Sequence, residues 1–573
     1  MTLTPDLVHQ TIARLTAPGG AFEVTDRDVA GATFRAFTHA VSTLPAVLAM
    51  GRNHGQADFL VCDDQRWSFD RFFGDVDALA AALQHDYGVV VGDRIAIAMR
   101  NSPDWFVVFA AASLVGAVVV PINSWGSADE LAFTLDNCGA GVLAADLPRV
   151  RLAASPLANT GIPVLFSEVD GPLDELARDV AARLDVRPIG AAMAANRGRG
   201  HAPARPAPED TALLMYTSGS TGHPKGVIYR HIAIGQALMH MMFAGFLAIE
   251  LGGGVELRGG AAAEAQLVTV PLFHATGLFS GFLLPCMVGQ KVALLRKWDA
   301  ERAMRVIAEE RITMLSTVPA ILKDLLTHPK FGDYDLSSIS RVAAAGAATP
   351  AGLPELLQDK LGIVSRSAGY GMTETAAVGA TMSGPVFDLK PLASGIASPI
   401  VDIRAVDAAG TVSPSPSDGE LQMRGITVSP GYWQLNELTQ EAFLADGWFR
   451  TGDVGHVDDD GFVHITGRIK EIVIRGGENI APIEIENAAY RHPDVKEVAV
   501  FGVPDDAMGE ELAMVCYPQP DATLTEDKLR CLLRETLPAF KVPKYITLSP
   551  CPLPRNASEK IHRLALRRSF MKG

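Results

Sequence analysis

The chain of 573 residues is 48% hydrophobic and 20% charged, which is ordinary for a globular protein and too long for a single hydrophobic core. Its 65 acidic residues outnumber its 50 basic residues, and the resulting net charge of −15 argues against wholesale binding to nucleic acid. Its six cysteines are scattered without a Cys-x-x-Cys pair, which argues against a zinc site or a disulfide framework and favours reduced thiols in the cytoplasm.

The N-terminus and the apolar stretches predict no segment that spans a membrane. Met1–Asp6 lacks the basic region and apolar core of a signal peptide. The nearest apolar stretch, 107–120, is shorter than the ~20 residues that a membrane span needs, and it reads as a helix followed by a strand. No transmembrane segment is therefore expected, and peripheral contact with a membrane stays open.

Helical and strand patterns alternate between residues 69 and 143. Residues 75–83 and 105–115 have the apolar spacing of helices, whereas 94–99 and 117–121 read as short apolar strands. Such alternation is typical of a layered α/β domain with a largely parallel sheet. We therefore expect the α/β fold class, with a large N-terminal domain of layered α/β subdomains.

A loop rich in glycines and hydroxyls follows the apolar strand 211–215. Residues 216–226 contain four Ser/Thr hydroxyls, three glycines and Lys225. Glycines let backbone N–H groups approach an anion, hydroxyls add donors, and lysine adds a positive charge. The loop therefore predicts a polyphosphate site, although it is not a Walker loop because Gly226 follows the lysine. The alternative is a Ser/Thr/Gly-rich surface turn.

Three later segments place functional side chains or small residues after strands or turns. His274 follows the strand 266–270, where a histidine is often only structural. The strand from Arg341 ends in small residues that leave room for a flat group. The Gly-x-Gly of 369–375 permits close approach of a ligand to the backbone, and the Thr-Glu pair after it offers oxygen ligands or a helix cap.

Two acidic segments follow turns further along the chain. The Asp453 carboxylate could accept hydrogen bonds from both hydroxyls of a ribose, whereas 458–461 reads as a solvated hairpin turn.

The C-terminal part reads as a separate small domain. A hinge is plausible at 467–470, between the strands 461–466 and 471–474. The remaining ~100 residues have helical and strand patterns of their own, enough for an α+β domain. We predict domains over residues 1–467 and 468–573.

These motifs, taken in order, carry a resemblance. The chain resembles the adenylate-forming superfamily of acyl-CoA synthetases, peptide-synthetase adenylation domains and luciferases over about residues 50–570, and most closely the fatty acyl-CoA synthetases. The resemblance implies a small mobile C-terminal domain and the use of ATP, Mg²⁺ and coenzyme A. It also implies a small-molecule carboxylic acid as substrate, and the oligomeric state stays open, with a homodimer as one candidate.

The resemblance assigns roles to particular residues. Thr217, His274, Glu374 and Lys560 become catalytic residues, with Glu374 as the magnesium ligand. His274 lies beside the acyl carboxylate, and Lys560 bridges that carboxylate and the α-phosphate. The residues assigned to nucleotide and coenzyme A binding or to domain rotation are Thr217, Ser218, Gly219, Ser220, Thr221, Gly222, Lys225, Gly346, Ala347, Ala348, Gly369, Tyr370, Gly371, Met372, Thr373, Asp453, Arg468, Lys470, Gly476 and Gly477.

Within that set, Tyr370 is expected to stack on adenine and Asp453 to hold the ribose, with Arg468 on ribose or phosphate. Lys470 is the expected pivot of the C-terminal domain, and Gly476 with Gly477 would admit a narrow thiol arm. The chain departs from the family pattern at three positions. Ala345 replaces a glycine and Ala348 a proline beside adenine, and Glu559 replaces the glycine before Lys560.

The expected reaction makes a carboxylate electrophilic. The acid attacks the α-phosphorus of ATP, pyrophosphate leaves, and a thiol then takes the acyl group from acyl-AMP. Coenzyme A is the expected thiol, because no carrier domain follows Lys560, and a neutral, apolar acid is expected because no aspartate marks an ammonium site. Alternatives are delivery to a separate carrier protein, another second step such as β-lactone formation, and a non-catalytic nucleotide or acyl binder.

Overall fold

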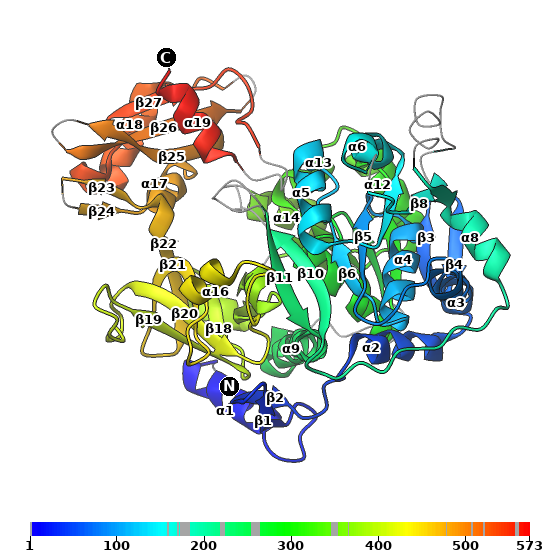
Figure 1. Cartoon of the computed structure of the whole chain (residues 1–573). Helices are drawn as coiled ribbons and strands as arrows, with labels where there is room; N and C mark the ends of the chain where they lie inside the picture. The colour runs from blue at the N-terminus through cyan, green and yellow to red at the C-terminus, as the bar shows by residue number, and fades with distance from the viewer. Residues whose placement is uncertain are drawn as a thin grey trace.

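The computed structural model describes residues 3–157, 160–168, 171, 184–217, 224–253, 264–344, 353–364, 366–476, 478–505, 508–519, 522–555 and 561–572. The chain begins with a helix and a hairpin, shown in blue at the bottom of Figure 1, beside the lower edge of the yellow sheet. The bounds of these first elements are α1 (Pro5–Leu15), β1 (Val24–Val29), β2 (Ala32–Phe37) and α2 (Leu44–Gly51).

The first sheet has seven strands in the order β11-β10-β6-β5-β7-β8-β9. All neighbouring pairs are parallel except β10 and β11, which form an antiparallel pair. Its strands are β5 (Arg94–Ala98), β6 (Val118–Pro121), β7 (Val142–Asp146), β8 (Val164–Ser167), β9 (Val186–Pro188), β10 (Thr211–Thr217) and β11 (Lys225–Arg230). The helices between them are α4 (Pro103–Leu114), α5 (Ala128–Cys138), α6 (Leu147–Leu157) and α8 (Ile189–Asn196).

The second sheet has six strands in the order β15-β14-β12-β13-β3-β4, parallel except for the last pair. Its strands are β3 (Asp58–Cys62), β4 (Gln65–Ser68), β12 (Ala265–Val268), β13 (Lys291–Leu294), β14 (Met314–Thr317) and β15 (Arg341–Ala344). Its helices are α3 (Phe69–His85), α10 (Ala275–Leu278), α11 (Leu284–Val288), α12 (Ala300–Glu310), α13 (Pro319–Leu326) and α14 (Leu353–Leu361), whereas α9 (His231–Ala248) follows β11 and contacts strands of the first and third sheets.

The third sheet is antiparallel throughout, in the order β16-β17-β18-β22-β21-β20-β19. Its strands are β16 (Ser367–Tyr370), β17 (Ala380–Ser383), β18 (Gly395–Ala397), β19 (Val401–Val406), β20 (Gly419–Gly425), β21 (Phe449–Val457) and β22 (Phe462–Arg468). Two helices accompany it, α15 (Pro385–Leu389) and α16 (Asn436–Ala442), and the short turns used below are η3 (Ile249–Gly253), η5 (Phe279–Leu283), η7 (Thr373–Thr375) and η8 (Ile469–Glu471).

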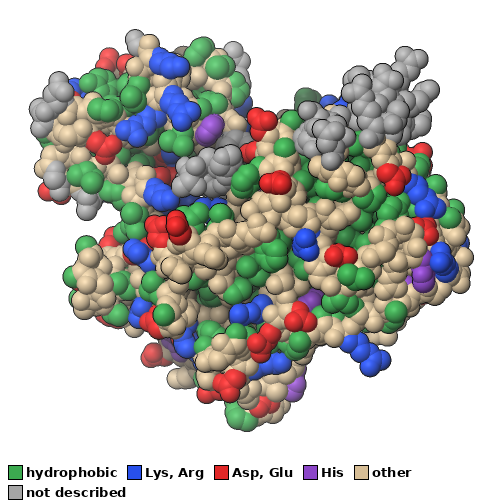
Figure 2. Space-filling model, viewed as in Figure 1, with side chains coloured by type: hydrophobic (Ala, Val, Ile, Leu, Met, Phe, Trp, Pro, Cys, Tyr) green, Lys and Arg blue, Asp and Glu red, His purple; other side chains and the backbone are tan. Residues whose placement is uncertain are grey.

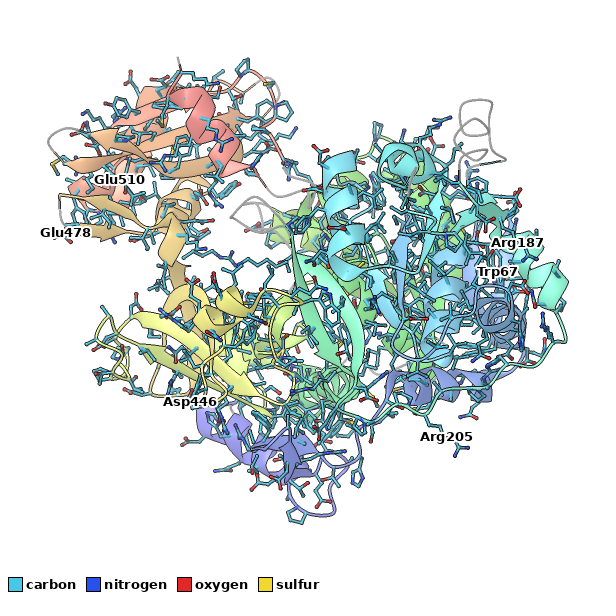
Figure 3. All side chains as sticks on the ribbon, in the orientation of Figure 1. Trp67, Arg187, Arg205, Asp446, Glu478 and Glu510 are labelled. Carbon is cyan, nitrogen blue, oxygen red and sulfur yellow. The ribbon has the colours of Figure 1, made fainter. Side chains whose placement is uncertain are left out.

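The C-terminal part forms a smaller α+β lobe, at the upper left of Figures 1 and 2. Its five-stranded sheet contains β23 (Val473–Arg475), β24 (Glu478–Ile480), β25 (Val495–Asp505), β26 (Gly509–Pro518) and β27 (Tyr545–Leu548). Its helices are α17 (Pro482–Ala489), α18 (Glu526–Thr536) and α19 (Arg563–Phe570). Glu478 and Glu510 mark this lobe at one side of the molecule, and Trp67 and Arg187 mark the opposite side (Figure 3).

The predicted fold class is confirmed, with a large N-terminal α/β domain and a smaller C-terminal domain. The boundary between residues 467 and 468 stays a proposal. Gly467 and Arg468 still belong to β22, where Arg468 pairs with Asp453 of β21, and the chain then turns through η8.

Aromatic side chains fill the core between the first two sheets. Phe59 of β3, Phe72 of α3, Phe106 of α4 and Phe282 of η5 are fully buried. The ring centres of Phe106 and Phe282 lie 4.5 Å apart, and those of Phe59 and Phe72 4.9 Å apart. Such pairs typically add about 0.5–1.5 kcal/mol each beyond the burial of their area. This core joins the two sheets into one support for the loops at their edges.

Helix α9 changes the expectation about membrane segments. Among the described residues, His231–Gly252 is long and apolar enough to cross a membrane by length and composition, with a mean hydropathy of 1.8. The stretch 107–120 was therefore not the nearest candidate, because it divides into α4 and β6. Half of the apolar window of α9 is buried inside the protein, as in a core helix.

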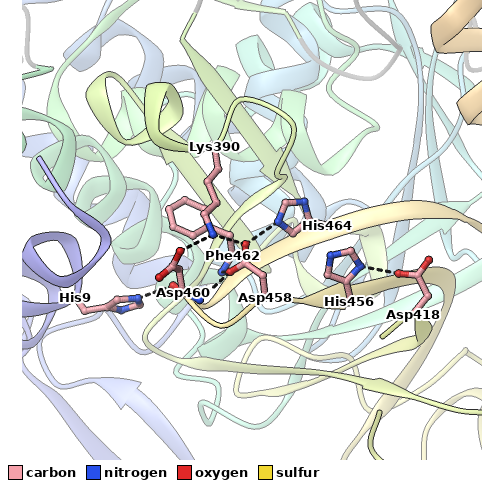
Figure 4. A network of polar contacts seen from close by, with 8 residues as sticks. All are labelled: His9, Lys390, Asp418, His456, Asp458, Asp460, Phe462 and His464. Atoms are coloured by element: carbon pink, nitrogen blue, oxygen red, sulfur yellow. Dashed lines mark hydrogen bonds and ion pairs between the residues drawn. The ribbon is translucent and has the colours of Figure 1, made fainter. Parts of the chain in front are cut away.

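The turn between β21 and β22 is the hairpin turn expected at 458–461, with Asp459 and Asp460 exposed, and it also carries a network of polar contacts. Lys390 contacts the carboxylates of Asp458 and Asp460 at 2.6 Å, and His464 bonds to Asp458 (Figure 4). Burial alone would raise the pKa of the Asp458 carboxyl, but the bonds to Lys390 and His464 outweigh burial and lower this pKa to about 2. His9 of α1 reaches the backbone oxygen of Asp460 at 2.8 Å, so the network ties the N-terminal helix to the third sheet.

Candidate active site

One cavity of about 1550 Å³ is lined by segments that lie far apart in the sequence. Its walls come from the facing ends of β10 and β11, from α9, from the segment after β12, and from β16 with η7. Residue Arg468, at the end of β22, also lines it. The layered fold therefore brings most of the predicted motifs to one place.

The residues that flank the predicted phosphate loop line this cavity. Thr217, the last residue of β10, and Lys225, the first of β11, face each other in the strand register, and both line the cavity. The loop residues Ser218, Gly219, Ser220, Thr221 and Gly222 lie outside the described residues. Lys225 Nζ lies 4.9 Å from the centre of the Tyr432 ring, a contact that sequence reasoning missed because Tyr432 carries no motif.

Glu374 is held at the cavity by the turn η7. Its carboxylate Oε1 accepts a hydrogen bond of 2.9 Å from the Tyr432 hydroxyl, and its backbone oxygen accepts one of 2.8 Å from Ser429 N–H. The Tyr229 hydroxyl donates to the backbone oxygen of Thr373 at 2.5 Å. Burial raises the pKa of the Glu374 carboxyl, while Tyr432, Lys225 and Arg468 oppose the rise. Glu374 is thus a buried carboxyl with few hydrogen-bond donors.

Gly371 is needed for the local path of the backbone, and its predicted place at the nucleotide stays a prediction. A Cβ at this position would collide with the backbone of Ala377, so Gly371 lets the chain pass close to its own turn. A Cβ on Gly369 would meet only ordinary contacts, beginning at 3.8 Å. Both glycines and Met372 line the cavity.

Tyr370, Asp453 and Arg468 form one polar cluster. Arg468 Nε contacts Asp453 Oδ1 at 2.8 Å, and the Tyr370 hydroxyl donates to Asp453 Oδ2 at 2.8 Å. Burial raises the pKa of the Asp453 carboxyl, against the lowering effect of Arg468 and Tyr370. Tyr370 and Arg468 line the cavity, whereas Asp453 is only 2% exposed behind them.

His274 lies at the cavity as the residue that precedes α10. Its backbone oxygen accepts from Leu278 N–H at 2.9 Å, and its ring centre lies 4.5 Å from that of Phe273. Gly277 lets this segment fold back, because a Cβ there would collide with the backbone of Pro271. The structure therefore places His274 on the cavity wall.

Two further predicted residues of the described chain do not line the cavity. Lys470 lies in η8 and Gly476 follows β23, and neither lines the cavity. Gly346, Ala347, Ala348, Gly477 and Lys560 lie outside the described residues.

The apolar wall contains residues that carry no recognisable motif. Met241, Met242 and Phe246 of α9 line the cavity, whereas Phe243 belongs to the core. Phe22, from the segment between α1 and β1, lines the same wall, and its ring centre lies 5.5 Å from that of Phe246. The only sequence signal for this wall was the apolar character of α9.

The carboxylates near the cavity can be compared with the ligands that a magnesium ion needs. The described residues contain no group of three or more His, Cys, Asp or Glu side chains placed to hold a metal. Magnesium is usually bound by one or two carboxylates and completes its shell with phosphate oxygens and water. Glu374, linked through Tyr432 to the lysine at the loop end, fits that donor set.

Comparison with known proteins places these features in a family. Two protein-family sequence models match the chain. The family described as AMP-binding enzyme matches residues 49–433, and the family described as AMP-binding enzyme C-terminal domain matches residues 484–560. A feruloyl-CoA synthase from Amycolatopsis sp is 33% identical over 484 residues, which cover 84% of this chain and 90% of the relative.

Two further proteins extend the match. A 3-[(3aS,4S,7aS)-7a-methyl-1,5-dioxo-octahydro-1H-inden-4-yl]propanoyl:CoA ligase from Mycobacterium tuberculosis is 34% identical over 537 residues, covering 92% of this chain and 98% of the relative. The crystal structure of ATP-bound MatB from Rhodopseudomonas palustris superposes with a TM-score of 0.78 at 26% identity, covering 92% of this chain and 99% of MatB. The chain therefore belongs to the AMP-binding enzyme family, and it is an acyl-CoA synthetase, an AMP-forming acid–thiol ligase that uses ATP and coenzyme A.

Proposed function

We propose that this enzyme activates an apolar carboxylic acid as acyl-AMP and passes the acyl group to coenzyme A. One observation carries the proposal. The ends of the phosphate loop, Glu374 and the apolar wall of α9 all line the same cavity. A triphosphate and an uncharged acyl tail could therefore lie end to end in it. The relatives are named for a feruloyl group and an octahydro-indenyl propanoyl group, so their names support acid–thiol ligation without choosing the acid.

The first half-reaction builds negative charge between the acid and the α-phosphate. Thr217 and Lys225, with the loop between them, would hold the triphosphate, and His274 would lie beside the acyl carboxylate. Lys560 would bridge that carboxylate and the α-phosphate. Glu374 would hold Mg²⁺, which when bound neutralises phosphate charge. Fixed charges of this kind stabilise the transition state because they need no reorganisation as the reaction proceeds.

The nucleoside would be held on the other side of the same cavity. Tyr370, with the 346–348 segment, would flank adenine, and Asp453 and Arg468 would bind the ribose. In the second half-reaction a thiol attacks the acyl carbon and AMP leaves. Lys470 would then serve as the pivot of a domain that begins at residue 468, with Gly476 and Gly477 beside the thiol arm. A cytoplasmic location and a homodimer stay proposals.

A panel of carboxylic acids tests this function. We expect apolar acids to give AMP and an acyl-CoA thioester in reactions that contain ATP, Mg²⁺ and coenzyme A. Reactions without coenzyme A are the control and should stop after pyrophosphate release. Pyrophosphate without a thioester would favour delivery to a carrier protein or another second step. A purified enzyme that binds ATP and releases no pyrophosphate with any acid would contradict the proposal.

Replacing Asp453 by asparagine tests the ribose assignment. The change keeps the shape and one acceptor, but it removes the charge that pairs with Arg468. We expect the KM for ATP to rise about tenfold or more, because hydrogen bonds to a charged group are typically worth ~1.5–3 kcal/mol. Initial rates of pyrophosphate release over a range of ATP concentrations give the value.

Asp418→Asn is the matched control for that change. Asp418 bonds to His456 and Thr466 in the same part of the third sheet and does not line the cavity. Its replacement should leave the KM for ATP unchanged. If Asp453→Asn also leaves that KM unchanged, Asp453 does not bind the ribose.

A further inference from the structure

His240, in the middle of α9, is a buried histidine that the proposed mechanism does not use. It lines the active-site cavity and is only 6% exposed. It also borders a second, small cavity whose lining residues come mainly from α1, α9 and β17. No predicted ATP-binding residue in the described part of the chain lines that second cavity. His240 therefore borders both the active-site cavity and a small cavity that these described residues do not line.

The hydrogen bonds around His240 account for only one of its ring nitrogens. Ser398 Oγ lies 3.0 Å from Nδ1 and also accepts a bond of 3.5 Å from the backbone N–H of Ile400. The Ser398 hydroxyl has one proton to donate, and when it donates that proton to Nδ1 the ring proton lies on Nε2. No described residue bonds to Nε2. Burial lowers the pKa of His240 to about 4, so the ring is neutral near pH 7.

The Nε2 atom of His240 is not among the fully buried side-chain atoms that lack a partner, and His240 lines the cavity, so a ligand there can reach this nitrogen. A ligand that displaces water from a polar atom must replace the lost hydrogen bond, because leaving the atom unpaired is costly. The surroundings also restrict what the partner can be. Ala244 and Ala248 of α9 and Thr381 and Ser383 of β17 line both cavities beside His240, and none of them is charged. Such a site favours an uncharged oxygen over an ionised group.

We propose that His240 Nε2 hydrogen-bonds an uncharged oxygen, a ketone or a hydroxyl, on the acyl group away from its carboxyl end. The enzyme would then prefer oxygenated apolar acids to plain hydrocarbon acids of the same size. This inference rests on the proposed function, because it requires the acid to lie in this cavity. Ser398 acts as a positioning residue that sets the tautomer and orientation of the imidazole.

The experiment uses saturated acids of equal chain length in which a ketone, or in a parallel set a hydroxyl, moves along the chain. The unsubstituted acid is the reference, and kcat/KM for pyrophosphate release is measured for each acid. We expect one position to exceed the reference by about tenfold, the size of one neutral hydrogen bond. A ketone oxygen can only accept a hydrogen bond, so a preference for ketones as well as for hydroxyls supports Nε2 as the donor.

Variants assign that preference to the side chain. His240→Leu should abolish the preference, measured as the ratio of kcat/KM for the oxygenated acid to that for the unsubstituted acid with the same variant, and His240→Gln, which keeps a donor, should retain part of it. Ser398→Ala should weaken the preference less than His240→Leu. His231→Leu is the matched control, because His231 is a second buried histidine of α9 that pairs with Leu44 N–H and does not line the cavity. It should leave the preference unchanged.

The outcomes separate this inference from the proposed function. If wild-type enzyme activates the unsubstituted acid but treats every oxygenated acid alike, the inference is wrong and the proposed function stands. A preference that persists in His240→Leu also overturns it. If no acid yields pyrophosphate, both fail. Should His240→Leu not fold, as judged by thermal melting, the comparison of wild type with His240→Gln and Ser398→Ala decides, and an unchanged preference in both overturns the inference.

Discussion

Replacing Glu374 by glutamine should reduce kcat for pyrophosphate release by about 10²–10³-fold, the usual cost of losing one charge-stabilising group at a transition state. Glutamine keeps the shape and an oxygen that can accept the bond from the Tyr432 hydroxyl, so the turn η7 should remain folded. What is lost is the negative charge proposed to hold Mg²⁺. Steady-state rates at saturating ATP, acid and Mg²⁺ measure the effect.

The pH dependence of the same pair of proteins provides a second measurement. Burial raises the pKa of the Glu374 carboxyl, so on acidification it takes up a proton at a higher pH than an ordinary glutamate would. The activity of the wild-type enzyme should therefore decrease as the pH is lowered through the pKa of Glu374. This decrease should be absent from the pH profile of Glu374→Gln. Glu420→Gln is the control, because Glu420 pairs with Arg450 and does not line the cavity. Full activity of Glu374→Gln would remove Glu374 from the mechanism.

Replacing Lys560 by alanine should nearly abolish adenylation and spare the second half-reaction. The proposed role of this lysine is to neutralise charge between the acid and the α-phosphate, and losing such a contact typically costs ~3–4 kcal/mol of barrier. Acyl-AMP supplied directly needs no such help, so thioester formation from acyl-AMP and coenzyme A should continue at close to the wild-type rate. The two half-reactions are assayed separately, by pyrophosphate release and by thioester formation.

Lys572→Ala is the matched control, because it removes a lysine from the same end of the chain, beyond α19. It should leave both half-reactions intact. Equal loss of both steps in Lys560→Ala would contradict the role given to Lys560. The same result tests the effect of Glu559, which stands where the family has glycine. If Lys560→Ala causes the expected loss of adenylation, Lys560 acts normally even with a glutamate before it.

Local sequence determined several of the individual elements and the class of the fold. The helix expected at 105–115 is α4, and the strands expected at 94–99 and 117–121 are β5 and β6, because short apolar runs and helical spacing reflect burial directly. The apolar strand expected at 211–215 is β10, and the glycine- and hydroxyl-rich residues 218–222 after it lie outside the described residues. The motifs in their order also predicted the family.

What the sequence alone determined about this protein is a part of its helices and strands, its family and the chemistry of its polar motifs, because these depend on residues that are neighbours in the chain. The tertiary structure alone decided which side chains meet. Tyr432 reaches Glu374 across 58 positions, Phe22 reaches the wall of α9, and Ser398 meets His240 across 158 positions. Such contacts depend on how helices and sheets stack. A single tyrosine, phenylalanine or serine in the sequence does not indicate which distant residue it will contact.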